Sequence, residues 1–112
     1  MAKSIQSIQQ LIDKIEKRED KRQKEGKKRI FHHRVISISL EKMNTQIYSD
    51  LDLAKADFFM CYGFLYGVFS LHLITESELE ILLKELRSSY RDCLERMIFG
   101  IERGCSYETS NS

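Results

Sequence analysis

The sequence predicts an all-α protein, built from a long antiparallel helical hairpin and an N-terminal amphipathic helix. The chain of 112 residues contains no Pro and only five Gly, so little in it forces frequent turns. Apolar residues recur at helical spacing through most of the chain, whereas the alternation typical of strands occurs in one short stretch. A chain of this length is expected to form one domain, completed as a helical bundle by self-association.

The first helix is expected at about residues 4–25. Ser4 is a favoured type of N-cap, and it precedes an apolar stripe that advances by 3, 4 and 3 residues. The stripe consists of Ile5, Ile8, Ile12 and Ile15, with Leu11 beside it. Polar residues fill the other faces, which is typical of a narrow, coiled-coil-like seam. A charge-dense run follows, and Gly26 marks the end of the helix.

Residues 26–38 are interpreted as a basic connector, and the stretch 30–40 leaves two alternatives open. Three apolar residues there alternate with serines, which is the pattern of a short strand. Alternatively, Ser37 or Ser39 caps the next helix, because a helical register opens at Leu40.

The predicted hairpin has two arms, residues 40–73 and 76–99. The register of the first arm contains Leu40, Met43, Ile47, Leu51, Ala54, Phe58, Cys61, Leu65, Val68 and His72. This arm is either one helix or two, because Ser49, with Asp52 three residues later, has the spacing of a new N-cap.

The second arm begins after a tight turn, because Thr75 and Glu78 have capping-box spacing. It carries an apolar stripe with i,i+4 ion pairs outside, Glu80 to Lys84 and Asp92 to Arg96. Gly100 or Gly104 is expected to end it. The single helical domain then spans residues 1–104, and the polar residues 105–112 are predicted to be a disordered tail.

The most apolar segment is Phe58 to Ile74, seventeen residues without a formal charge. At about 1.5 Å per residue it covers about 25 Å, less than a hydrocarbon core of about 30 Å. Acidic residues, Asp57 and Glu76, stand at its ends without a cationic anchoring pattern. A soluble helix is therefore favoured, and a membrane-associated hairpin is kept as an alternative.

A helix that is apolar on every side must be covered on every side, so part of this segment is expected to be an interface. Gly63 and Gly67 have GxxxG spacing, and each costs about 1 kcal/mol relative to Ala inside a helix. They admit another helix closely, either the second arm of the same hairpin or another molecule. The predicted protein interface consists of Phe59, Tyr62, Gly63, Tyr66 and Gly67. The expected partners are a second copy, forming a dimer, and an unidentified target protein.

The charge is distributed unevenly. Residues 1–35 contain eleven Lys/Arg and five Asp/Glu, a net charge of +6, whereas residues 36–112 contain seven and twelve, a net charge of −5. The basic patch consists of Lys21, Arg22, Lys24, Lys27, Lys28, Arg29 and Arg34. With Phe31, His32 and His33 nearby, this patch makes nucleic acid a further candidate partner. The same residues are also explained by a solvated linker, or by a surface that attracts the acidic second half of a partner chain.

No pattern in the sequence points to catalysis. Cys61 and His72 are eleven residues apart on one predicted helix, about 16 Å, which is too far for a thiol nucleophile and its base. Cys61 and Cys93 both fall on apolar stripes, as small buried hydrophobes do. Nucleotide-binding and zinc-site motifs are lacking. We expect no enzyme activity, no cofactor and no metal, and a cytoplasmic location.

Residues 58–90 combine an apolar helix, an L-I-T-x-x-E turn and an amphipathic return helix. This combination resembles the hairpins of small all-helical accessory proteins of bacteriophages and other mobile elements. The resemblance implies interference with a host protein machine and assigns no functional residue. The predicted function is a non-catalytic protein-binding module that acts as an adaptor, inhibitor or regulator, and the alternative is a nucleic-acid-binding regulator that uses residues 21–34.

Overall fold

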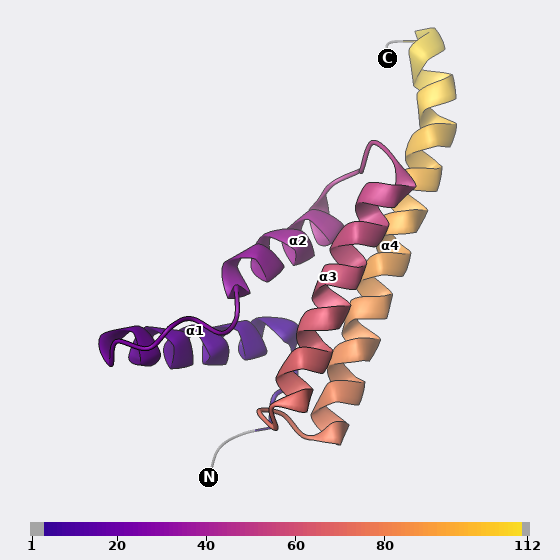
Figure 1. Cartoon of the computed structure of the whole chain (residues 1–112). Coiled ribbons are helices and arrows are strands. Elements are labelled where there is room, and N and C mark those ends of the chain that lie inside the picture. Colours follow the sequence, from indigo (N-terminus) through magenta and orange to yellow (C-terminus); the bar gives the residue numbers. More distant parts are fainter. Residues whose placement is uncertain (1–3, 111–112) are drawn as a thin grey trace.

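The structure, a computed structural model, describes residues 4–110, with side chains described for residues 4–99. It contains four helices, α1 (Ile8–Lys24), α2 (His33–Thr45), α3 (Leu51–Ser70) and α4 (Glu76–Ser110). Within these residues there is no strand, and the predicted all-α class is confirmed. In Figure 1, α3 and α4 run side by side in opposite directions, and α1 and α2 lie on one side of this hairpin.

The turn between α3 and α4 follows the predicted capping chemistry. The Thr75 backbone N–H donates to Glu78 Oε1 at 2.8 Å, and the Glu78 N–H donates to Thr75 Oγ1 at 3.1 Å. These reciprocal bonds are a capping box. At the end of α3, His72 has a φ of 60°, and the Leu73 N–H donates to the Val68 carbonyl at 3.2 Å. This left-handed residue stops the helix in a Schellman motif, so His72 is exposed and does not continue the apolar register.

The first arm of the predicted hairpin is two helices, because the chain leaves helical conformation between Thr45 and Leu51. The broken alternative is therefore correct, although the cap is Asp50 and not Ser49. The Asp50 carboxylate accepts the Leu53 N–H at 3.1 Å. Ile47, a member of the predicted register, is exposed in this connection.

The segment 30–40 is helical from His33 onward, so the alternatives of a strand and of a cap at Ser37 or Ser39 are both wrong. The basic connector is also shorter than residues 26–38, because α2 already begins at His33. The physical reason is a buried stripe at helical spacing, formed by His33, Ile36, Leu40 and Met43. A strand would have placed Ile36 and Ile38 on the same face, whereas Ile36 is buried and Ile38 is exposed.

The N-terminal helix forms as predicted but begins at Ile8, because Ser7 and not Ser4 is its N-cap. The Ser7 hydroxyl accepts the Gln10 N–H at 3.2 Å. Carboxylates of α4 bind the start of this segment: Glu78 accepts the Ile5 N–H at 2.6 Å, and Glu85 accepts the Ile8 N–H at 2.8 Å. Ile5 is therefore buried although it precedes the helix.

The last helix is longer than predicted. It continues to Ser110, through both Gly100 and Gly104, so most of the predicted tail 105–112 is helical. A glycine costs about 1 kcal/mol in a helix but keeps its backbone hydrogen bonds, and the chain has no Pro to stop the helix. Residues 111–112 of the predicted tail lie outside the described residues.

Neither predicted i,i+4 ion pair of α4 forms among the described side chains. Arg96 instead donates through Nη2 to the carbonyl groups of Met43 and Gln46 at the C-terminal end of α2. Those carbonyls have no partner within their own helix, so Arg96 ties α2 to α4.

The molecule is elongated, with principal extents of 58 × 30 × 22 Å. Its radius of gyration is 17.1 Å, whereas a compact domain of this length has about 13 Å. The main core lies where α2, α3 and α4 meet and where the start of α1 packs on them. Over the residues that the structure describes, none of the four helices is both long enough and apolar enough to cross a membrane.

Candidate functional site

The five residues of the predicted protein interface lie together on one side of α3. Their spacing of three and four residues places them on one helix face. Phe59 is 61% exposed and Tyr66 is 38% exposed, whereas Tyr62 and Gly67 are half-buried. Cys61, Leu65 and Val68, on the other side of the helix, are fully buried. The structure therefore brings the predicted residues together on the outer face of α3.

The two glycines of this face do not serve the packing of the hairpin. A Cβ atom at Gly63 would meet no described atom within 4 Å. A Cβ atom at Gly67 would meet only Phe31 Cε1, at 3.8 Å, an ordinary van der Waals distance. The prediction that these glycines admit the second arm of the same hairpin is therefore wrong. Gly67 accommodates the connector before α2, and Gly63 faces open space.

An aromatic row, formed by Phe58, Phe59, Tyr62 and Tyr66, runs along the side of the outer face that is nearer to α4. The ring centroids of Tyr62 and Tyr66 are 4.8 Å apart, and those of Phe59 and Tyr62 are 6.5 Å apart. Phe58 stacks on Tyr90 of α4 at 4.5 Å, so the row is attached to the hairpin. A hydrogen bond with the Tyr62 hydroxyl raises the pKa of Tyr66.

A groove borders the same face on the side of α2. Its volume is about 360 Å³, close to the lower end for ligand pockets. It is lined by Ile30, Phe31, His32, Val35, Ile36, Met60 and Phe64. The rings of Phe31 and Phe64 meet edge to face at 5.6 Å and form its inner wall.

The sequence interpretation missed this groove. The signal was present, because Ile30, Val35 and Ile38 are apolar but lie off the buried stripe of α2. Neither interpretation of residues 30–40, as a strand or as a connector, predicts that these three residues form an apolar surface separate from the buried stripe. All three are exposed, as is Met60 across the groove, at 43%.

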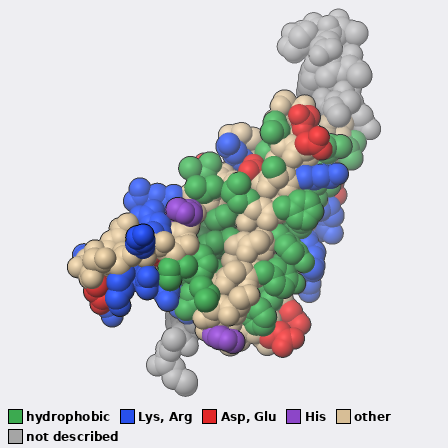
Figure 2. All heavy atoms as spheres, in the orientation of Figure 1, with side chains coloured by type: hydrophobic (Ala, Val, Ile, Leu, Met, Phe, Trp, Pro, Cys, Tyr) green, Lys and Arg blue, Asp and Glu red, His purple; other side chains and the backbone are tan. Residues whose placement is uncertain are grey.

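The groove and the outer face of α3 form one surface, which we call the apolar face. It consists of Ile30, Phe31, Val35, Ile38, Phe59, Met60, Tyr62, Gly63, Tyr66 and Gly67. Figure 2 shows hydrophobic side chains gathered over α2, α3 and α4, with Lys and Arg side chains over α1 on one side and along α4 on the other. Between residues 58 and 71 the chain has no charged residue, so the middle of this face is uncharged.

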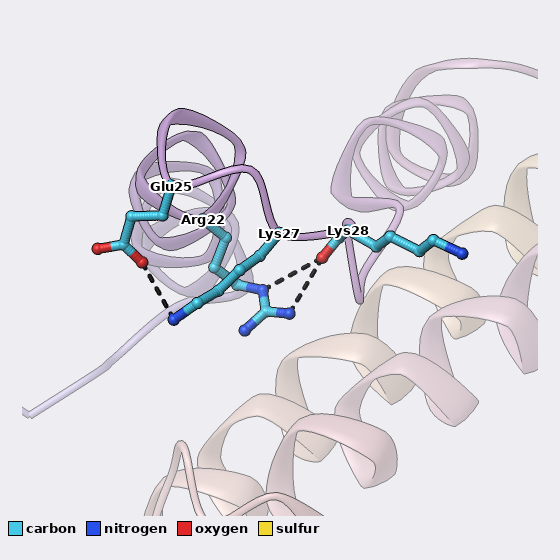
Figure 3. Close-up of polar contacts among 4 residues, drawn as sticks. All are labelled: Arg22, Glu25, Lys27 and Lys28. Atoms are coloured by element: carbon cyan, nitrogen blue, oxygen red, sulfur yellow. Dashed lines mark hydrogen bonds and ion pairs between the residues drawn. The ribbon is translucent and has the colours of Figure 1, made fainter.

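The residues of the predicted basic patch do not form one free surface. Arg22 donates through Nε and Nη2 to the Lys28 carbonyl, at 3.2 and 3.1 Å, and holds the turn after α1. Lys27 pairs with Glu25 at 3.2 Å, whereas the Lys28 side chain extends away from this group (Figure 3). Arg29 is half-buried. The exposed remainder divides into Lys21 and Lys24 on α1, Lys28 in the connector and Arg34 on α2.

Two polar residues near the basic patch belong to the interior. Glu19 is fully buried, and its carboxylate accepts the N–H groups of Ile30 and Phe31 at 3.0 to 3.2 Å. His33 is 2% exposed, with Nε2 at 3.4 Å from Glu16 Oε2. These contacts join α1 to the start of α2. They fix the connector so that Phe31 lies against α3.

The described cysteines are buried as predicted, and their thiols are poor nucleophiles. Burial, together with the nearby Asp57 carboxylate, raises the pKa of the Cys61 thiol to about 12. Burial also raises the pKa of Cys93. Since the thiolate is the reactive form, neither site favours thiol chemistry at neutral pH.

No protein-family model, curated protein or solved structure matches the chain. The candidate site is therefore the apolar face, with Lys and Arg side chains on either side of it.

Proposed function

We propose that the protein is a non-catalytic protein-binding module that acts as an adaptor, inhibitor or regulator of a larger protein machine. The observation that supports this function is the apolar face, which is exposed and uncharged in its middle. Contiguous exposed apolar surface bordered by polar residues is typical of interaction sites, because a monomer gains nothing from exposing it.

The shape of the apolar face suits a protein partner. Its centre, α3, has 20 residues, a length of about 30 Å, which matches a partner helix of five or six turns. Gly63 offers no side chain at the middle of this length, so another backbone can approach closely. The groove beside it receives a side chain of the partner, and Phe59 and Tyr66 supply the large anchors that protein interfaces favour.

Two kinds of protein partner fit this proposal. The first is an unrelated target, and the second is another copy of the chain, which would form a dimer through the same face. The elongated shape supports either, because a compact single chain of this size would leave less of its surface uncovered. The solution mass at several concentrations separates them, since only self-association depends on the concentration of the protein itself.

A comparison of two charged variants as bait tests the proposed function. Phe59→Lys places a charge on the apolar face, and Ile98→Lys places one at an exposed apolar position of α4, eight residues beyond the Tyr90 that stacks on Phe58. Proteins captured from nuclease-treated extract should be lost with Phe59→Lys and kept with Ile98→Lys. If both variants capture what the wild-type protein captures, the apolar face is not the binding site.

Nucleic-acid binding is the second candidate, and one observation favours it. Residues 26–40 contain four Lys/Arg and no Asp/Glu, beside the aromatic ring of Phe31. Phosphate contacts weaken steeply as salt rises, so the affinity for a single-stranded oligonucleotide should fall sharply between about 50 and 200 mM salt. Affinity that is absent, or that is unchanged by salt, excludes this candidate.

A further inference from the structure

We infer that the partner of the apolar face is an amphipathic helix whose apolar stripe is bordered by carboxylates. This inference rests on the proposed protein-binding function and names the chemistry of its partner. Cations that have no carboxylate within 4.0 Å among the described side chains border the apolar face on both sides.

The first border lies where the connector enters α2. Lys28 and Arg34 are exposed, and among the described side chains neither has a carboxylate within 4.0 Å. Lys28 points away from the turn that holds Lys27 (Figure 3). Both cations lie close in sequence to Ile30 and Val35, which line the groove. Because residues 26–40 contain no acidic residue, nothing local neutralises them.

The second border lies on α4. Lys84, Arg87 and Arg91 are spaced by three and four residues, so they form one row on the helix surface. All three are exposed and have no carboxylate within 4.0 Å in the described part of the chain. Tyr90, one helical turn from Arg87 and next to Arg91, stacks on Phe58 of α3 at 4.5 Å. The row of cations therefore adjoins the aromatic row, at the edge of the apolar face.

A helix fits this arrangement better than a strand or a nucleic acid. The centre of the face is itself a helix, whose backbone groups are bonded internally, so it offers no edge for an added strand. The rings beside the groove pack on one another, Phe31 on Phe64, Phe58 on Tyr90 and Tyr62 on Tyr66, whereas bases require free aromatic faces for stacking. Carboxylates at the borders would meet cations, and leucines between them would cover the apolar side chains.

A second copy of the chain fits less well. In a symmetric pair the same face of both copies meets, so both would bring cation rows to one interface. Like charges brought together in this way oppose association, whereas an acidic helix is attracted to both borders.

A displayed library of helical peptides of about 20 residues, the length of α3, tests this inference. Leucines are fixed at helical spacing, and the flanking positions vary among Glu, Lys, Gln and Ser. Selection is carried out on the wild-type protein and on the double variant Lys28→Glu/Arg87→Glu, whose substituted side chains are exposed and leave the core intact. Selected peptides are then measured by fluorescence anisotropy against both proteins and against Phe59→Lys.

Peptides selected on the wild-type protein are expected to carry Glu at the flanking positions and to lose about tenfold in affinity on the double variant. Peptides selected on the double variant should carry Lys instead. Selected peptides without a charge preference, lost on Phe59→Lys, would refute the acidic partner but leave the proposed function intact. If no selected peptide depends on Phe59, both the inference and the proposed function are wrong.

Two further measurements distinguish the rival occupants. Tight binding of a labelled single-stranded oligothymidylate that competes with the selected peptides would assign the face to nucleic acid and refute the inference. A dimer in solution that the peptides dissociate would assign it to a second copy and also refute it. A monomer that binds the acidic peptides, without competition from the oligonucleotide, supports it.

Discussion

The two faces of α3 carry similar side chains but have different surroundings. Leu65 and Val68 on the inner face are fully buried, whereas Phe59 and Met60 on the outer face are 61% and 43% exposed. The inner face is covered because α2 and α4 both pack on it, and the outer face has no such cover within the described chain. An apolar residue type therefore does not decide burial here. The arrangement of the neighbouring helices decides it, and the uncovered face is the one available to a partner.

The largest expected contrast between the faces is in stability. Leu65→Ala removes a fully buried side chain and should lower the free energy of unfolding by about 2 to 5 kcal/mol. Phe59→Ala removes an exposed side chain of similar apolar character and should lower it by less than about 1 kcal/mol. Urea unfolding followed by circular dichroism measures both. Equal losses would mean that Phe59 is covered in solution, and the distinction between the faces would fail.

The rate at which a thiol reacts should differ between the two faces of α3 by about two orders of magnitude. Because burial raises the pKa of Cys61 to about 12, little thiolate forms at pH 8, and reagent reaches it only when the structure opens. Phe59→Cys, two residues away, places a thiol on the exposed face. In a background with Cys93→Ser and Cys105→Ser, that thiol should react with an aromatic disulfide about 100-fold faster than Cys61. Comparable rates in the absence of denaturant would contradict the buried position of Cys61.

The glycine on the outer face gives a smaller, stabilising effect. Gly63→Ala should raise the free energy of unfolding by about 1 kcal/mol, because Ala favours helix and the new Cβ meets open space. Gly63→Leu should also fold but should weaken binding at the apolar face, because its side chain keeps a partner helix away. Gly67→Ala is the matched control, because the same substitution on the same helix places a Cβ atom 3.8 Å from Phe31 Cε1 and not in open space. Destabilisation by Gly63→Ala would mean that another part of the chain packs there.

The features predicted correctly from sequence depend on residues close together in the chain. The Thr75–Glu78 capping box and the apolar stripe of α1 are examples, because each is determined within one or two helical turns. The interface residues on α3 share a face for the same reason, since helical spacing alone places Phe59 beside Gly63 and Tyr66.

The features missed depend on contacts that are distant in sequence. The start of α2 has no side-chain cap of its own, and Glu19 of α1 binds the connector before it, so no capping residue marked His33 as the beginning of the helix. The apolar residues beside the groove are visible in the sequence, but the shape of the groove depends on the contact between Phe31 and Phe64, which the sequence does not reveal. The shift of the helix start from Ile5 to Ile8 likewise accompanies contacts with Glu78 and Glu85, more than seventy residues away.

The smallest expected effect concerns Glu78, the acidic residue of α4 that binds the segment before α1 through the Ile5 N–H. The pKa of Glu78 is lowered from its ordinary value of 4.5, chiefly by the hydrogen bond from the Ile5 N–H. A lowered pKa in the folded state means that the bond stabilises the fold above the ordinary pKa and is lost as pH falls through the folded value. Because Glu78 is only half-buried, solvent screening limits the effect to less than about 1 kcal/mol.

Glu78→Gln should therefore be slightly less stable than the wild-type protein at pH 7, and the difference should shrink below about pH 4. Glu80→Gln, an exposed position two residues along α4, is the control and should change stability less. Urea unfolding at pH 7 and at pH 3.5 measures the difference. A difference between Glu78→Gln and the wild-type protein that stays constant with pH would mean that the Glu78 carboxylate does not hold Ile5. The start of α1 would then be attached to the core by its apolar side chains and by the bond between Glu85 and the Ile8 N–H alone.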